Sequence, residues 1–462
     1  MDRRGKDRLI DRRPGKYTIL TWGCQMNFHD SEKLASALEE QGYRRAGGAT
    51  DADVILLNTC AIREKAAEKV FSELGRLRPL KLRNPDLVLG VCGCVAQQEG
   101  ERIYERAPHV DIVLGPRATG TLPEALLRAR SSTDGLRITD TESRDDSIRF
   151  PFDRIRRHGT SPAKAYTTIV EGCNHACTFC IVPRTRGREV CRDSQDVIEE
   201  VRSLSARGVV EIEFLGQTVN AYRDGSGKTL ADLLPRTAEI HGIERIRFTT
   251  SHPAQMSLRL MDAMAASQPK VCPYLHLPVQ SGSSSVLRAM KRGYDREGYL
   301  RKVDALRRRI PDLSLGTDLI VGFPTETEED FEATLSLLDD VQFDTVYSYT
   351  YSSRPDTVAA GLVDPVTPGQ KLDRLARLHA KQKAIQERRN RAWVGREVVV
   401  LVEGPSKRDP GDWCGRTPEN RRVNFAGPSA PGRMERVRII GSSAYALRGG
   451  RRATRTAALD RA

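Results

Sequence analysis

The sequence predicts an α/β protein in three parts: a doubly wound parallel sheet, a β/α barrel and a small all-β barrel. Three observations lead to this prediction. Short apolar runs alternate with amphipathic stretches over residues 15–131, and the alternation resumes over 166–390. Residues 391–454 then carry apolar runs separated by Gly and Pro, without helical spacing. A length of 462 residues fits three domains better than one.

The first part contains four apolar runs that predict buried strands: YTILTWG, DVILLNT, LVLGVCG and VDIVLG. Apolar residues recur at helical spacing in 30–41, 64–78, 97–106 and 120–130. Strands that alternate with helices form parallel sheets with helices on both faces. We therefore expect a doubly wound domain over 15–131 and a polar linker over 132–165.

The second part repeats this alternation. Its predicted strands are YTTIVEG, VVEIEFLG, RIRFTTS, LSLGTDLIVG and TVYSYTY, and its helices include 194–207, 284–291 and 297–309. About six such units indicate a partial or complete β/α barrel over 166–390. A long charged helix over 371–391 ends this domain.

The last part predicts strands in REVVVLVEG, RRVNFAG, ERVRIIG and SAYALRG, as in a small barrel of the oligonucleotide-binding type. The chain has a formal net charge of +13, and from Arg389 onward 16 Lys and Arg stand against 7 Asp and Glu. A solvated basic surface is the simpler interpretation. A basic module with its own strands nevertheless favours contact with RNA or DNA.

The composition also bounds the class of protein. No window holds about 18 uncharged apolar residues, so we expect no membrane span. The N-terminal stretch MDRRGKDRLIDRRPGK lacks the apolar run of a secretory signal. We therefore expect a cytoplasmic protein, in which thiols stay reduced. Ten cysteines in that compartment favour metal or redox chemistry over disulfides.

Three cysteines gather in the motif EGCNHACTFCIVP: Cys173, Cys177 and Cys180. The motif follows the first predicted barrel strand, at the end where β/α barrels build active sites. Three thiolates can hold a 4Fe–4S cluster and leave its fourth iron open to a small molecule. The alternatives are a zinc site with His175 as a ligand, or three unrelated core cysteines. Because His175 lies inside the loop between two of the cysteines, we favour the cluster.

A second set of cysteines lies in the first part, each just after a predicted strand: Cys24, Cys60 and Cys94. The carboxyl ends of strands in a doubly wound sheet line one crevice, where ligands bind. The set could therefore hold a second cluster with an open iron, or its members could be buried packing residues. We place Cys92 inside the strand and interpret Cys191, Cys272 and Cys414 as packing or incidental thiols.

The motif GCNHACTFC resembles the signature of the radical S-adenosylmethionine (SAM) enzymes. Together with the second set, the chain resembles the radical-SAM methylthiotransferases from about residue 16 to 449. The resemblance rests on WGCQMN, NTCAIRE, GCVAQ, EGCNHACTFCIVP, TRGRE, LGQTVNAY, FTTSHP, HLPVQSGS, DLIVGFPTETEEDF, YSSRPDT and GRTPENRRVNF. One departure is Asp356 in YSSRPDT, where family members often carry Gly.

This resemblance implies a radical-SAM barrel, with Cys173, Cys177 and Cys180 holding the SAM cluster. Cys24, Cys60 and Cys94 would hold an auxiliary 4Fe–4S cluster, and the last domain would be a TRAM module that contacts RNA. The implied reaction adds a methylthio group to carbon 2 of N6-isopentenyladenosine at position 37 of the tRNA anticodon loop. It uses two SAM molecules, a sulfur source and a reductant. No catalytic residue beyond the cluster ligands is assigned.

Further candidates rest on weaker signals. Gln217 and Asn220, in LGQTVN at a strand end, could contact SAM or simply order their loop. Arg416, Asn420, Arg421 and Arg422 could contact RNA phosphate and sugar groups, which position RNA without specifying its sequence, or could be solvated charges.

Two rival functions remain at this point. Related enzymes methylthiolate threonylcarbamoyl-adenosine in tRNA or an aspartate of a ribosomal protein, and their cysteine plan is the same. A non-catalytic iron–sulfur RNA-binding sensor is the other rival, although two clusters with open irons argue against it. The expected partners are tRNA, an electron donor such as flavodoxin or ferredoxin, and cluster-assembly or sulfur-donor proteins. We expect a monomer with no membrane partner.

Overall fold

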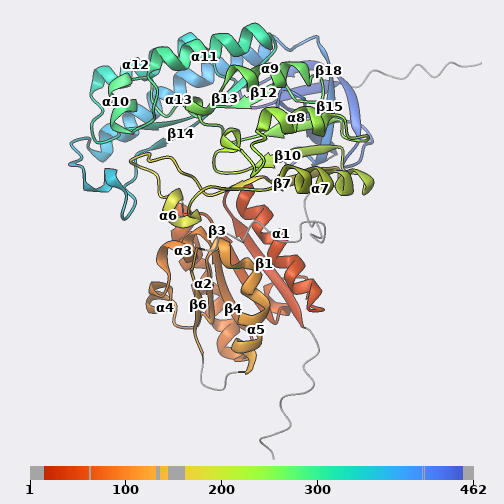
Figure 1. Cartoon of the computed structure of the whole chain (residues 1–462), viewed down its shortest axis with the longest axis vertical. Coiled ribbons are helices and arrows are strands. Elements are labelled where there is room, and N and C mark those ends of the chain that lie inside the picture. Colours follow the sequence, from red (N-terminus) through yellow and green to blue (C-terminus); the bar gives the residue numbers. More distant parts are fainter. Residues whose placement is uncertain are drawn as a thin grey trace, which may run out of the picture.

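The computed structural model describes residues 15–61, 64–131, 136–143, 162–407, 409 and 411–450. Figure 1 shows a lower α/β part at the N-terminal end of the chain and a larger upper part that holds the rest. The small all-β barrel in blue lies against one side of the upper part. The three-part α/β prediction is thereby confirmed.

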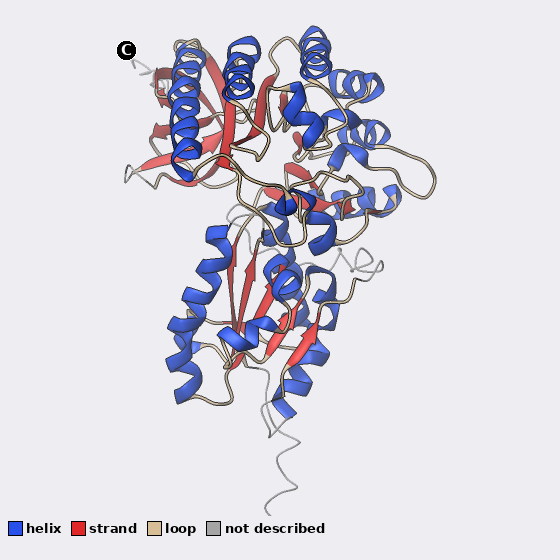
Figure 2. Cartoon of the chain, turned by 90° about the vertical axis from the view of Figure 1, so that its left-hand side faces the viewer, coloured by secondary structure: helices blue, strands red, loops and turns tan. Residues whose placement is uncertain are grey.

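The N-terminal part is one parallel sheet of order β2-β1-β3-β4-β5-β6. Its strands are β1 (Lys16–Trp22), β2 (Arg44–Arg45), β3 (Val54–Thr59), β4 (Val88–Gly93), β5 (Ile112–Leu114) and β6 (Ile138–Asp140). Its helices are α1 (Gln25–Glu40), α2 (Glu64–Arg83), α3 (Cys94–Glu99), α4 (Arg102–Arg106) and α5 (Leu122–Ser131). Helices cover both faces of the sheet (Figure 2).

Two separate apolar cores account for this doubly wound arrangement. On one face, Leu34 of α1 and Leu126 of α5 pack on the sheet. On the other face, Leu74 of α2 and Ile103 of α4 pack on it. The strands are buried on both faces, which is why their sequences are continuous apolar runs instead of alternating patterns.

The structure changes several of the predicted boundaries. The predicted helix 97–106 is two helices, α3 and α4, and the chain between them passes through Gly100 at φ +53°. Part of the predicted linker belongs to the sheet, because β6 pairs with β5. Residues 132–135 and 144–161 of that linker lie outside the described residues.

The central part has six parallel strands in two sheets of order β11-β10-β7 and β12-β13-β14. They are β7 (Lys164–Thr168), β10 (Glu211–Leu215), β11 (Arg245–Phe248), β12 (Tyr274–His276), β13 (Ser314–Val321) and β14 (Thr345–Thr350). A bridge between Ile246 and Val271 joins the sheets. Among the described residues β7 and β14 are edge strands, so the barrel is partial. The strand β12 was not predicted.

Helices wrap the convex side of this barrel, and all of them except α10 contribute to one apolar core. They are α7 (Ser194–Ala206), α8 (Leu230–Ala238), α9 (Leu258–Ala266), α10 (Ser284–Ala289), α11 (Arg296–Arg309), α12 (Glu328–Val341) and α13 (Pro368–Arg391). Two short strands and a short helix flank the cysteine loop: β8 (Val170–Glu171), β9 (Val190–Cys191) and α6 (Val182–Arg186). In the described part of the chain, no helix is both long and apolar enough to cross a membrane.

The C-terminal part is a closed five-stranded barrel of order β15-β16-β17-β19-β18. Its strands are β15 (Glu397–Pro405), β16 (Asp412–Arg416), β17 (Arg422–Ala426), β18 (Met434–Ser442) and β19 (Leu447–Gly450). Four of them match predicted strands, and β16 was not predicted. Val400, Val423 and Phe425 are among the residues that fill the barrel.

Two buried arginines of β11 attach this small barrel to the larger one. Arg245 donates hydrogen bonds to the carbonyl oxygens of Arg416 and Val399, at 2.8 and 2.9 Å. Arg247 donates to the carbonyl oxygens of Pro418 and Thr417, at 2.8 and 2.7 Å. The position of the C-terminal barrel is therefore set by backbone acceptors in β15, at the end of β16 and in the two residues that follow β16.

Candidate cluster sites and RNA-contact surface

The three N-terminal cysteines follow neighbouring strands that end at the same level. Trp22 of β1 lies opposite Thr59 of β3, and Thr59 lies opposite Gly93 of β4. The cysteines come one or two residues after these positions: Cys24, Cys60 and Cys94. The parallel register thus brings three thiols that are distant in sequence to one edge of the sheet.

The thiols at this edge influence one another. A hydrogen bond with Cys60 is the main cause that lowers the pKa of Cys24 to about 6, and the cation of Arg186 acts in the same direction. Burial raises the pKa of Cys94, and the Arg186 guanidinium opposes that rise. Cys24 is also the N-cap residue of α1, where a negative charge is favoured. This environment suits thiolate ligands.

Cys92 has different surroundings. It lies within β4 and belongs to the apolar core under α1 and α5. Burial raises the pKa of its thiol to about 12. Cys94, in contrast, is the first residue of α3, after Gly93 at φ +85°. A β-carbon at Gly93 would collide with the Asn58 side chain, so only glycine allows this turn.

The second cysteine set lies in the loop that follows β8, at the carboxyl end of the first barrel strand. The Cys173 sulfur accepts a hydrogen bond from the backbone N–H of His175 at 3.4 Å, and the Cys180 N–H donates to the Cys177 carbonyl at 3.1 Å. Arg292 donates from Nη1 to the Cys177 sulfur at 3.3 Å. The loop is thus ordered by hydrogen bonds between its own residues, and the Arg292 cation lies beside the Cys177 thiol.

Each cysteine set supplies three sulfur donors, the number that a 4Fe–4S cluster with one open iron takes. Within the described ranges, no group of three His, Cys, Asp or Glu side chains is close enough to hold one metal ion. The ring of His175 stacks on His252 with centroids 3.9 Å apart. A 4Fe–4S cluster would take each of the three cysteines on a different iron.

The amide candidates Gln217 and Asn220 both bind backbone. Gln217 accepts a hydrogen bond from the Gly172 N–H, directly before Cys173. Asn220 donates to the His252 carbonyl at 2.9 Å and accepts from its N–H at 2.8 Å. These bonds order the loops beside the cysteines. A contact of either amide with SAM stays a prediction.

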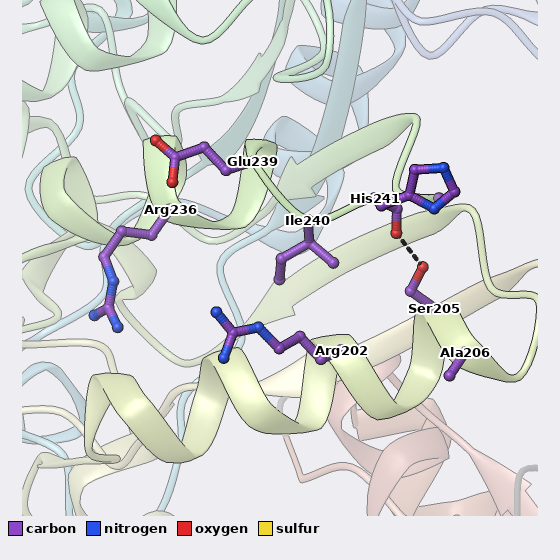
Figure 3. A pocket seen from close by; sticks show the side chains of 8 residues that line it. Arg202, Ser205, Ala206, Arg236, Glu239, Ile240 and His241 are labelled. Carbon is purple, nitrogen blue, oxygen red and sulfur yellow. Dashed lines mark hydrogen bonds between the residues drawn. The ribbon is translucent and has the colours of Figure 1, made fainter.

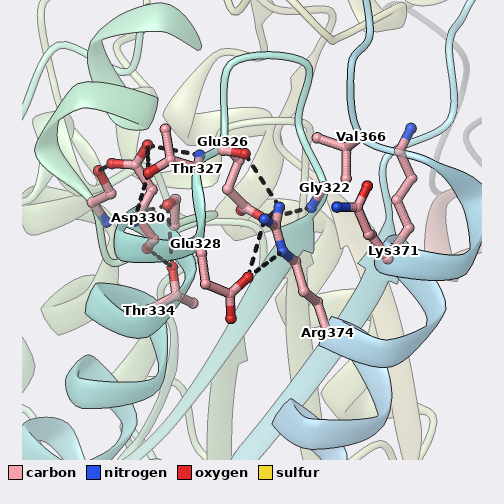
Figure 4. Close-up of polar contacts among 12 residues, drawn as sticks. Gly322, Glu326, Thr327, Glu328, Asp330, Thr334, Val366, Lys371 and Arg374 are labelled. Carbon is pink, nitrogen blue, oxygen red and sulfur yellow. Dashed lines mark hydrogen bonds and ion pairs between the residues drawn. The ribbon is translucent and has the colours of Figure 1, made fainter.

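A buried carboxylate lies in the loop between β13 and α12 (Figure 4). Glu326 accepts from the Gly322 N–H at 2.7 Å and from Arg374 of α13 at 2.8 Å. Its Oε2 atom has no hydrogen-bond partner among the described residues. Burial raises the pKa of Glu326 to about 7. This contact holds α13 against the mouth of the barrel.

The four RNA-contact candidates of the C-terminal barrel divide into two groups. Arg416 and Asn420 hydrogen-bond to each other at 3.2 Å, and Arg416 also pairs with Glu403 at 3.1 Å. Arg422 is exposed. Arg421 is buried, and its guanidinium bonds to Asp344 and Asn390. The charge of Arg421 is thus used inside the protein, and a contact of this residue with RNA stays a prediction that these bonds disfavour.

One hollow on the surface has no cysteine among its lining residues. It has a volume of about 670 Å³ and lies between α7 and the segment after α8 (Figure 3). Ser205 donates to the His241 carbonyl across its floor at 2.6 Å, and Arg202 and Arg236 are at its rim. No cysteine lines it, so we assign no chemistry to this hollow.

Sequence reasoning did not single out two arginines that the structure places beside cysteines. Arg186 is buried next to Cys24 and Cys94, and Arg292 contacts Cys177. Arg186 lies in the quoted motif TRGRE, but nothing in that motif marks it as buried.

Comparison with known families agrees with this architecture. Residues 16–115 match the family described as uncharacterized protein family UPF0004, 167–338 match the radical SAM superfamily, and 391–450 match the TRAM domain. The fold and the cysteine loop thus define the class of protein as a radical-SAM enzyme with a TRAM domain.

Curated relatives define the family within this class. The tRNA-2-methylthio-N(6)-dimethylallyladenosine synthase of Bordetella petrii is 50% identical, over 93% of this chain and 89% of its own. The enzymes of the same name from Janthinobacterium sp. and Nitrosomonas europaea are 48% and 47% identical, each over 94% of this chain and 98% of their own. The chain belongs to the tRNA-2-methylthio-N(6)-dimethylallyladenosine synthase family.

Solved structures share the fold at low sequence identity. The radical SAM methyltransferase TsrM from Kitasatospora setae, with cobalamin and a 4Fe–4S cluster bound, has a TM-score of 0.56 at 16% identity. It covers 75% of this chain and 77% of its own. The cobalamin-dependent SAM radical enzyme OxsB has a TM-score of 0.53 at 13% identity, over 80% of this chain and 56% of its own.

Proposed function

We propose that this protein transfers a methylthio group to carbon 2 of N6-isopentenyladenosine at position 37 of tRNA. The observation that carries the proposal is the convergence of Cys24, Cys60 and Cys94 at one sheet edge, next to a barrel that presents a second three-cysteine loop. A carbon–hydrogen bond of an adenine ring is not acidic enough for a general base at neutral pH, so radical chemistry suits this position.

In this proposal each cysteine set binds one 4Fe–4S cluster: Cys24, Cys60 and Cys94 the auxiliary one, and Cys173, Cys177 and Cys180 the SAM cluster. When bound, the SAM cluster would pass one electron from the reductant to SAM, whose cleavage into methionine and a 5′-deoxyadenosyl radical starts the reaction, and the auxiliary cluster would offer an open iron for the sulfur to be transferred. We propose the auxiliary site for the domain predicted at 15–131, the SAM site for 166–390 and RNA binding for 391–454. The sheet adds β6 to the first of these domains, and β7 starts the second at Lys164.

The protein's own residues would then bind and orient. Arg292 holds the Cys177 sulfur at 3.3 Å, and Gln217 fixes the backbone before Cys173. Arg416, Asn420 and Arg422 are proposed to contact phosphate and sugar groups, which position the anticodon loop without reading its sequence. The adenine must leave the base stack to reach the region between the two sites, as bases do in other base-modifying enzymes.

The substrate choice rests on similarity over nearly the whole chain to synthases named for dimethylallyladenosine. The sibling reactions on threonylcarbamoyl-adenosine or a ribosomal-protein aspartate use the same cysteine plan and remain the second candidates. A cytoplasmic location, a flavodoxin or ferredoxin donor, and cluster-assembly or sulfur-donor partners belong to the same proposal.

Mass spectrometry of tRNA nucleosides tests the proposal. Cells without the gene should accumulate N6-isopentenyladenosine and lack its 2-methylthio derivative, and the wild-type gene should restore the derivative. A Cys177→Ala gene serves as the matched control and should not restore it. Unchanged 2-methylthio-N6-isopentenyladenosine, with loss of methylthiolated threonylcarbamoyl-adenosine instead, would overturn the substrate assignment in favour of the sibling reaction.

A further inference from the structure

The two cysteine sites are joined by a buried ionic network at the interface between the N-terminal sheet and the barrel. Asp30 and Lys33 belong to α1, which begins directly after Cys24. Arg186 and Glu171 belong to the barrel. Arg186 Nη2 lies 2.6 Å from Asp30 Oδ2, and Lys33 Nζ lies 2.8 Å from Glu171 Oε1. All four side chains are at most 4% exposed.

Arg186 reaches this network from the SAM-site loop. It is the last residue of α6, which packs against α3, the helix that starts at Cys94. The next residue, Gly187, accepts a hydrogen bond from the backbone N–H of Cys173 at 3.2 Å. One short segment therefore contacts the backbone of a SAM-site cysteine and places a cation beside the auxiliary cysteines.

The guanidinium of Arg186 is only partly satisfied. Nη2 is held by Asp30, whereas the buried Nη1 has no nitrogen or oxygen partner among the described residues, and the Cys94 thiol is a hydrogen-bonding side chain beside the guanidinium. A buried donor without an acceptor is destabilising, and a charged one more so. The groups beside Arg186 on which its charge acts are Asp30, Glu171 and the thiols of Cys24 and Cys94. Because Asp30 already holds Nη2 and Glu171 pairs with Lys33, a cysteine sulfur is the acceptor suited to Nη1.

We propose that Arg186 is a positioning residue of the auxiliary site, contributed by the barrel. Asp30 orients the guanidinium, and Nη1 donates to a sulfur of the thiolate-bound group that Cys24, Cys60 and Cys94 hold. The auxiliary site is then complete only when the two domains are docked. A cation and a hydrogen bond at the sulfurs favour the more negative, reduced state, so Arg186 raises the reduction potential of that group.

The test is an EPR-monitored redox titration of the anaerobically reconstituted full-length protein. The Cys177→Ala background removes the SAM cluster, so that the signal comes from the auxiliary cluster alone. In that background Arg186→Gln should shift the potential to more negative values, and Arg186→Lys, which keeps the charge, should shift it less. Arg192→Gln is the matched control, because Arg192 is an equally buried arginine whose carboxylate partner, Glu200, lies within the barrel. It should leave the potential unchanged.

An unchanged potential in Arg186→Gln, or an equal shift in Arg192→Gln, would overturn the proposal. Loss of the auxiliary iron in Arg186→Gln but not in Arg186→Lys would support it. Loss of that iron in both variants, with loss of secondary structure by circular dichroism, would assign Arg186 to domain docking alone and would also overturn it. The inference rests on the proposed auxiliary cluster. Wild-type protein with a single cluster would refute both proposals, whereas two clusters with an unshifted potential would refute this one alone.

Discussion

Arg421 and Arg422 are adjacent in the chain but have opposite surroundings, so alanine at the two positions should affect different properties. The Arg421 guanidinium is buried and bonds to Asp344 and Asn390. It also lies over Trp393, 4.8 Å from the ring centroid. Arg422 points outward from β17 and is exposed. Variants at these two positions therefore compare an arginine that stabilises the fold, Arg421, with an arginine that is a candidate for RNA contact, Arg422.

The expected magnitudes follow from these contacts. Removing one partner of a buried ion pair costs about 3–5 kcal/mol. In Arg421→Ala, Asp344 would still have two partners, Arg389 at 2.7 Å and the Leu315 N–H at 2.9 Å. We therefore expect the free energy of unfolding to fall by an amount near the lower end of this range, about 3 kcal/mol. Arg422→Ala should change the unfolding free energy by no more than about 0.5 kcal/mol. It should instead reduce the salt slope of tRNA binding by about one unit.

Denaturant unfolding followed by tryptophan fluorescence measures the first quantity, since Trp393 lies next to Arg421. Binding of unmodified tRNA over a salt series measures the second. If Arg421→Ala left stability unchanged and lowered the salt slope, while Arg422→Ala did the opposite, the placement of the two side chains would be refuted.

Three further predictions concern the cysteine sites and the barrel mouth. Cys177→Ala should lose half of the cluster iron and all SAM cleavage, and iron analysis that finds no loss would contradict the assignment. Cys94→Ala should abolish methylthiolation but keep abortive SAM cleavage, whereas Cys92→Ser should keep both; the reverse pattern would make Cys92 the ligand. Glu326 has a pKa raised from 4.5 to about 7, so its stabilising effect is complete below about pH 4.5 and is lost as the pH rises through about 7. Glutamine at this position resembles the protonated carboxyl group. Between about pH 5 and about pH 8, the unfolding free energy of Glu326→Gln should therefore fall less than that of the wild type. If the two plots of unfolding free energy against pH were parallel, this prediction would be contradicted.

Much of the fold could be predicted because its signals are local. Continuous apolar runs mark strands buried on both faces, and their ends locate Cys24, Cys60 and Cys94 without any long-range information. The missed strands lack such runs. β12 is three residues long, and β16 reads DWCGR, which has neither an apolar run nor clear alternation.

Arg186 and Arg421 show what the sequence does not reveal. Both are charged residues that local patterns place at the surface, yet each is buried by a partner on a distant element, Asp30 and Asp344. Asp356 is a different case. It has φ +63°, in the region that favours glycine, which gives a physical reason for the Gly that family members often carry there.

The most direct test of the central claim is an assay with purified components. Anaerobically reconstituted protein is mixed with tRNA that carries N6-isopentenyladenosine, SAM, sulfide and a low-potential reductant, and the tRNA nucleosides are then analysed by mass spectrometry. The account predicts 2-methylthio-N6-isopentenyladenosine from the wild type and none from Cys177→Ala or Cys94→Ala. A wild-type protein that holds both clusters and cleaves SAM but leaves this nucleoside unmodified would contradict it.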